Sequence, residues 1–101
     1  MQLIQILLPL CDNRGRKFPA AKFQHVKAVL SQKFDGLTAC SRSAAEGLWK
    51  KGARLQRDDI VVYEVMAPSL NRAWWRRYRK TLQALFAQDS IVIRAQRITM
   101  V

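Results

Sequence analysis

The chain has 101 residues, half of them hydrophobic, and its 18 Lys and Arg against 7 Asp and Glu give a formal charge of +11. This length allows one domain with a single core, and the apolar content argues against intrinsic disorder. The charge favours anionic partners such as nucleic acid, membrane headgroups or acidic metabolites, although a merely solvated basic surface accounts for it equally well. Cys11 and Cys40 are too few and too far apart for a metal or redox motif, so a reduced cytoplasmic protein is the simplest expectation, with a disulfide between them left open.

The first half of the chain predicts a strand, a helix and a second strand. Residues 3–10 form an apolar strand, which is too short to span a bilayer and lacks the features of a signal peptide. Pro19 begins a helix whose apolar residues recur at helical spacing, with Gly36 as its C-terminal stop. Residues 36–42 predict a short strand that continues, bent or bulged, to residue 50, and 51–58 predict a hairpin connection.

The second half predicts a strand, a helix and a last strand. Residues 59–67 are nearly all β-branched or aromatic, as in a central strand, with Glu64 in the middle. The second helix opens with Ser69 or Asn71 as its N-cap. Its apolar stripe consists of Trp74, Tyr78, Leu82, Leu85 and Phe86, with Trp75 at the flank. Residues 91–98 form the last strand.

This order of elements predicts an α+β fold over residues 1–101. We expect a ferredoxin-like βαββαβ two-layer sandwich, in which a four-stranded antiparallel sheet carries two helices on one face and each strand has one clean core face. The first and third strands are then central. Gln5 and Glu64 would lie on the open face of the sheet, with Arg94 and Gln96 on the neighbouring edge strand. The remaining residues of that face are apolar. An exposed apolar face of this kind is expected to bind a partner, either a second copy of the chain or a ligand.

Three groups of residues are candidates for a site. A Glu64–Arg94 pair on the open face is either a structural bridge or part of a ligand site. Near the predicted bend, a second group either lines a site or is structural, with Trp49 closing the edge of the core and Arg42 paired with Glu46; its members are Arg42, Glu46, Trp49 and Tyr63. The second helix interleaves aromatic residues with the basic residues Arg72, Arg76, Arg79 and Lys80. That pattern is typical of nucleic-acid surfaces, but it also fits a solvated helix face. No metal-ligand spacing or phosphate-binding loop occurs, so we expect no metal and no cofactor.

Several segments resemble a family of small bacterial proteins that share a domain of unknown function. They are Asp12-Asn13-x-Gly15, Gly36-Leu37-Thr38-Ala39-x-Ser41-Arg42, Glu46-Gly47-Leu48-Trp49, Glu64-Val65-Met66 and Trp74-Trp75-x-x-Tyr78-Arg79. The resemblance covers nearly the whole chain and implies a ferredoxin-like α/β sandwich of bacterial origin. That family carries no activity to transfer, so the resemblance implies no catalytic residue.

The sequence thus favours a cytoplasmic homodimer, joined through the open sheet face, that binds a small anionic ligand. The predicted cleft is lined by Arg42, Glu46, Trp49, Glu64 and Arg94. If the protein is an enzyme, Glu64 would be the acid–base residue and Arg94 or Arg42 would hold the anion. Two alternatives stay open. One is a nucleic-acid-binding module that uses the four basic residues of the second helix, and the other is a structural dimer without a ligand. No membrane association is expected.

Overall fold

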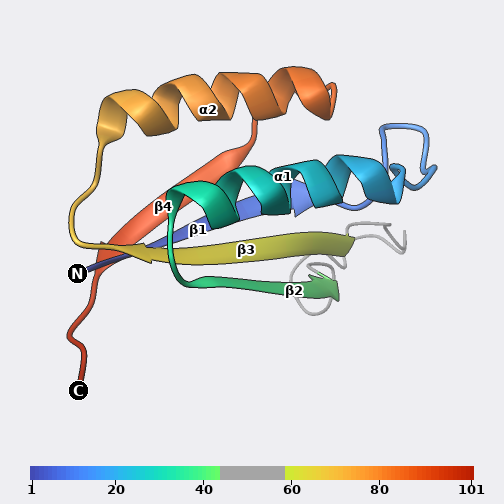
Figure 1. Ribbon diagram of the computed structural model, residues 1–101. Helices are drawn as coiled ribbons and strands as arrows, with labels where there is room; N and C mark the ends of the chain where they lie inside the picture. The colour runs from blue at the N-terminus through green and yellow to red at the C-terminus, as the bar shows by residue number, and fades with distance from the viewer. Residues whose placement is uncertain (44–58) are drawn as a thin grey trace, which may run out of the picture.

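The computed structural model describes residues 1–43 and 59–101. The elements follow one another as β1 (Gln2–Pro9), α1 (Ala20–Lys33), β2 (Leu37–Ser43), β3 (Asp59–Ala67), α2 (Arg72–Leu85) and β4 (Val92–Arg97). Together they form an α+β fold with both helices on one side of the sheet (Figure 1). The bent segment and the hairpin predicted from sequence lie outside the described residues, and so do Glu46 and Trp49.

The strands are arranged in the order β2-β3-β1-β4, and each neighbouring pair is antiparallel. The two strands with the most continuous apolar sequence, β1 and β3, are therefore the inner ones. Their register places Gln5 opposite Glu64 on one side and opposite Arg94 on the other. Because Thr38 is also opposite Glu64, a single row of residues crosses the whole sheet.

Alternation along the inner strands builds the core. Ile4, Ile6 and Leu8 of β1 are fully buried, whereas the residues between them are only half-buried. The alternate residues of β3 meet them from the next strand, and the helices cover this face with Val26, Leu30, Trp75, Tyr78 and Leu82. The period-2 pattern of the sequence therefore identifies the buried face of β1 correctly.

The predicted ferredoxin-like fold needs a correction at its edge. The sequence pattern predicts that every strand buries one clean core face, and this is wrong for β4. Ile91, just before β4, is 6% exposed, Ile93 is half-buried and Ala95 is exposed. Every other residue of β4 is exposed as well. The helix layer thus covers the inner strands but leaves β4 progressively open, because α2 does not stay packed against β4 along its length. For the complete sheet, α+β is the description that the structure supports.

Both helices differ from the prediction in detail. Gly36 is not the stop of α1: the helix ends at Lys33, and Phe34 is already extended, with φ −126° and ψ 148°. The ring of Phe34 stacks on Trp75 at 5.3 Å, so a contact with the other helix fixes this end.

In α2, Asn71 is the N-cap, because its side chain accepts a hydrogen bond from the backbone N–H of Trp74. Trp75 is buried and Trp74 is half-buried, the reverse of the predicted stripe.

Candidate functional site

A polar row on the open face joins three strands. The amide nitrogen Nε2 of Gln5 donates to Oε2 of Glu64 at 2.6 Å, and Nε of Arg94 donates to Oε1 of Gln5 at 2.7 Å. Glu64 and Arg94 belong to strands on either side of β1, about 10 Å apart at the usual strand spacing. The predicted direct bridge between Glu64 and Arg94 is therefore wrong. The side-chain amide of Gln5, which both donates and accepts, connects the two charged groups instead.

A hollow of about 280 Å³ lies beside this row, at the edge formed by β1 and β4. It is lined by Leu3, Gln5, Arg94, Ala95 and Gln96. Arg94 is the one cationic residue of this lining, and its Nε is already bonded to Gln5. An anion placed here would meet one partly engaged guanidinium, with the Glu64 carboxylate at the other end of the same row. The hollow is therefore a weak site for an anionic ligand.

The structure brings only part of the predicted cleft together. Glu64 and Arg94 lie in one row, as expected from the sequence. Arg42 is in β2 opposite Ile60, four residues beyond Thr38, and so about 13 Å along the strand from that row. The other two predicted lining residues are those outside the described part of the chain. The acid–base role assigned to Glu64 stays a prediction.

A second hollow, of about 260 Å³, lies on the helix side of the sheet, between α2 and β4. Its apolar lining consists of Ile4, Leu70, Trp75, Ile93 and Ala95. It occupies the place where β4 loses its cover, since burial falls from Ile91 to Ala95 along the strand. We call it the α2–β4 pocket.

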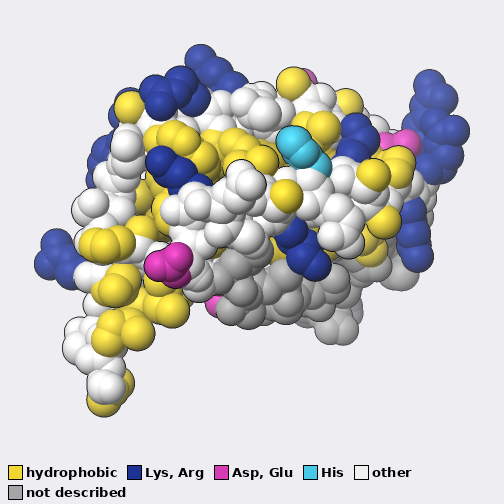
Figure 2. All heavy atoms as spheres, viewed as in Figure 1, with side chains coloured by type: hydrophobic (Ala, Val, Ile, Leu, Met, Phe, Trp, Pro, Cys, Tyr) yellow, Lys and Arg dark blue, Asp and Glu magenta, His cyan; other side chains and the backbone are white. Residues whose placement is uncertain are grey.

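Three arginines of α2 complete the lining of the α2–β4 pocket. Arg72, Arg76 and Arg79 follow one another at about one helical turn, so they lie along one side of the helix. All three are exposed, and basic side chains gather over α2 in Figure 2. Arg94 also borders the pocket, but its guanidinium is bonded to Gln5 on the opposite face of the sheet.

The electrostatics of the α2–β4 pocket favour an anion. The first turn of α2 contains no acidic residue, and the pocket includes Arg72 at the positive end of the helix dipole. Among the side chains of residues 1–36 and 60–101, the only ion pair joins Asp12 and Arg16, far along the chain from α2. None of the carboxylates in those ranges therefore neutralises Arg72, Arg76 or Arg79.

The aromatic residues of α2 belong to the interior. Trp74 stacks on Tyr78 with ring centroids 5.0 Å apart, and Trp75 stacks on Phe34. Trp75 and Tyr78 are less than 10% exposed, and burial together with the nearby Tyr63 raises the pKa of Tyr78 to about 12. The buried rings have no free face for a nucleic-acid base. The alternation of basic and aromatic residues in the sequence therefore separates into a core face and an arginine face.

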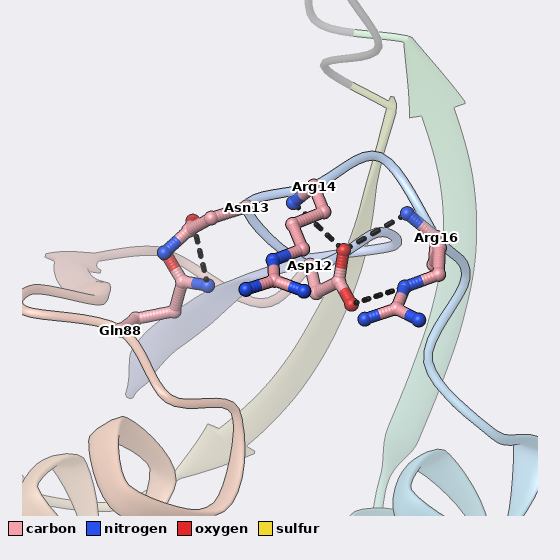
Figure 3. A network of polar contacts seen from close by, with 5 residues as sticks. All are labelled: Asp12, Asn13, Arg14, Arg16 and Gln88. Carbon is pink, nitrogen blue, oxygen red and sulfur yellow. Dashed lines mark hydrogen bonds and ion pairs between the residues drawn. The ribbon is translucent and has the colours of Figure 1, made fainter.

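The Asp12 motif forms a turn (Figure 3). Oδ1 of Asp12 accepts hydrogen bonds from the backbone N–H groups of Arg14 at 2.8 Å and Arg16 at 2.9 Å. The bond from Arg16, then the bond from Arg14 and the charges of both arginines, hold the pKa of Asp12 below its ordinary value of 3.8. Gly15 supplies the positive φ of 85°, and Gln88, three residues after α2, donates a hydrogen bond to Asn13. These contacts explain the motif as a structural turn.

Sequence reasoning found the arginines of α2 but not the pocket beside them. The helical pattern placed them on an outer face, and nothing in it indicates where α2 and β4 separate. The signal that could have found the pocket is the weak apolar character of the end of β4, where Ala95 follows Ile93 on the helix side.

Comparisons with family models, with curated proteins and with solved structures gave no match for this chain. The resemblance to a bacterial family therefore stays an expectation from sequence. No helix among the described residues has the length and apolar character needed to cross a membrane. The same residues contain no cluster of His, Cys, Asp and Glu side chains that could hold a metal ion.

Proposed function

We propose that this protein is an anion-binding domain and that its ligand, a small negatively charged molecule, occupies the α2–β4 pocket. One observation carries this proposal: Arg72, Arg76 and Arg79 line a hollow with an apolar floor, and no described carboxylate pairs with them. The volume of about 260 Å³ is close to the lower end of the usual range for small-molecule sites, roughly 300–1,000 Å³. The anionic ligand expected from sequence is retained, with its site on the helix side of β4 instead of the open face.

The nucleic-acid alternative uses the same basic residues together with Lys80. The charge of +11 favours it. The burial of Trp75 and Tyr78 counts against it, because base stacking on exposed aromatic residues supplies much of the affinity of single-strand-binding proteins. An oligonucleotide would be held through its phosphates alone, with an affinity that falls steeply as salt is raised.

Isothermal titration calorimetry with methyl phosphate, acetate and a mixed-sequence oligonucleotide tests the proposal. The informative variant is Arg76→Gln, and the matched control is Arg77→Gln, an exposed neighbour on α2 that does not line the pocket. Loss of one charged hydrogen bond should weaken methyl phosphate binding by about 10-fold or more in Arg76→Gln, and leave Arg77→Gln near wild type. Equal losses in both variants, or no binding of either small anion, would contradict the proposal. Binding of the oligonucleotide alone, lost at high salt, would favour the alternative.

We also propose that the protein forms a cytoplasmic homodimer through the open sheet face. Met66 and Val92, which are 38% and 51% exposed, supply apolar surface on that face. Light scattering should then give twice the mass of one chain. Val92→Lys should shift the mass to that of the monomer, whereas Ala84→Lys on the exposed side of α2 should not. A monomeric wild-type protein would exclude the dimer. A dimer that binds no anion would leave the structural dimer as the function.

A further inference from the structure

We infer that the ligand of the α2–β4 pocket is an amphiphilic anion, with a phosphate-like head and a short apolar tail. This inference rests on the proposed function and names the class of ligand. It follows from the two unlike walls of the pocket. One wall is basic and consists of arginines of α2. The other is apolar and comes mainly from β4 and the segment before α2, with Ile4 of β1 and Trp75 of α2.

The basic wall selects the head. Arg72, Arg76 and Arg79 present planar guanidinium groups, each of which can donate two parallel hydrogen bonds to a phosphate or carboxylate. The N-terminal end of α2 adds the positive end of the helix dipole beside Arg72. A neutral head would make no charge-assisted hydrogen bonds with these exposed guanidinium groups.

The apolar wall selects the tail. Leu70 and Ile93 are half-buried and Ala95 is exposed, so this wall keeps apolar surface in contact with water. Trp75 and Ile4 lie beneath it and are almost fully buried. The one charged residue on this side, Arg94, has its guanidinium on the other face of the sheet. A hydrophilic anion such as free phosphate would leave the wall exposed, whereas an alkyl chain would cover it.

The size of the pocket limits the length of the tail. The pocket is open to solvent, and its volume of about 260 Å³ lies just below the range usual for drug-sized ligands, roughly 300–1,000 Å³. A phosphate head with a tail of a few carbons is the class of ligand that suits this volume. The best-fitting probe is therefore butyl phosphate, and longer chains should extend into solvent.

A homologous series of methyl, ethyl, propyl, butyl and hexyl phosphate, titrated into the full chain at fixed ionic strength, tests this inference. Burial of each methylene should raise the affinity by about fourfold, the factor that corresponds to about 0.8 kcal/mol, up to butyl phosphate. Hexyl phosphate should gain little more. Ala95→Gln, which places a polar group on the apolar wall, should flatten the rise in affinity from methyl to butyl phosphate. Arg97→Gln, on the same strand but outside the pocket lining, is the matched control and should keep the rise.

The outcomes separate the inference from the proposed function. Equal affinities for methyl and butyl phosphate would overturn the amphiphilic ligand but leave an anion site at the arginines. A rise with chain length that persists in Ala95→Gln would show that the tail binds elsewhere, and would also overturn the inference. If no member of the series binds, the proposed function fails together with the inference.

Discussion

Gln5 has the most consequential side chain on the open face, because one amide holds both an acid and a base. Replacing it in Gln5→Leu leaves the half-buried Glu64 carboxylate and the Arg94 guanidinium without this partner. Loss of hydrogen bonds to charged groups should lower the free energy of unfolding by about 1–3 kcal/mol, measured by urea denaturation. The control is Gln2→Leu, since Gln2 is a half-buried residue of β1 with no side-chain hydrogen bond among the described residues. Equal effects of the two variants would mean that the row contributes nothing to stability.

Tyr78 carries a buried hydroxyl that has no hydrogen-bond partner among the described residues. Tyr78→Phe should therefore leave the free energy of unfolding at neutral pH unchanged, or raise it by up to about 1 kcal/mol, because the desolvated hydroxyl is removed.

The pH dependence of the free energy of unfolding gives a second test. The pKa of Tyr78 rises from 10.0 to about 12 in the folded protein, mainly through burial. The stability linked to this shift is fully present below pH 10 and is lost as the pH rises through 12.

Denaturation curves at pH 7, 9, 10 and 11 should show this loss in the wild-type protein and a smaller loss in Tyr78→Phe. Tyr63→Phe is the comparison, because the hydroxyl of Tyr63 donates a 3.5 Å hydrogen bond to the carbonyl of Phe23. Burial also raises the pKa of Tyr63, so this variant should reduce the alkaline loss too, but unlike Tyr78→Phe it should lower the free energy of unfolding at neutral pH. Identical alkaline profiles for the wild type and Tyr78→Phe would refute the assignment.

At the scale of elements, the C-terminal end of α2 is held by the other helix. Its last turn contains no basic residue, but Nζ of Lys22 in α1 donates to the carbonyl of Leu85 at 2.6 Å. A cation at this position interacts favourably with the negative end of the helix dipole. Lys22→Met should reduce the free energy of unfolding by about 1 kcal/mol. Lys27→Met, an exposed lysine of the same helix, should have almost no effect, and a cost as large as that of Lys22→Met would refute the capping role.

The elements also show how far sequence reasoning extends. The alternation of Ile4, Ile6 and Leu8 identifies the buried face of β1, and Asn71 caps α2 through a local interaction, so both follow from neighbouring residues. The end of α1 does not, because the contact of Phe34 with α2 determines it. The α2–β4 pocket depends on how α2 packs against β4, and its one local sign in the sequence is the small Ala95 after Ile93 on the helix side of β4. The mediating role of Gln5 likewise depends on the register of three strands.

At the scale of the whole molecule, Phe86 tests whether the described parts fold as one cooperative unit. Phe86 is fully buried at the end of α2, where it contacts Phe18 at 5.0 Å and Phe23 at 5.3 Å. Phe86→Ala should cost about 3–5 kcal/mol, a large part of the 5–15 kcal/mol typical of a domain.

Trp74 and Trp75 lie near the opposite end of α2, so in a Trp49→Phe background, which removes the third tryptophan of the chain, tryptophan fluorescence reports on a region far from the substitution. If the helices and the sheet unfold together, fluorescence and far-ultraviolet circular dichroism should give coincident urea transitions, shifted equally by Phe86→Ala. Phe23→Leu, at a half-buried position of the same aromatic cluster, should shift both probes less. Separate transitions would show instead that the aromatic cluster at the end of α2 unfolds independently. The arginines near the start of that helix would then stay in place when the cluster is lost, and anion binding would survive Phe86→Ala.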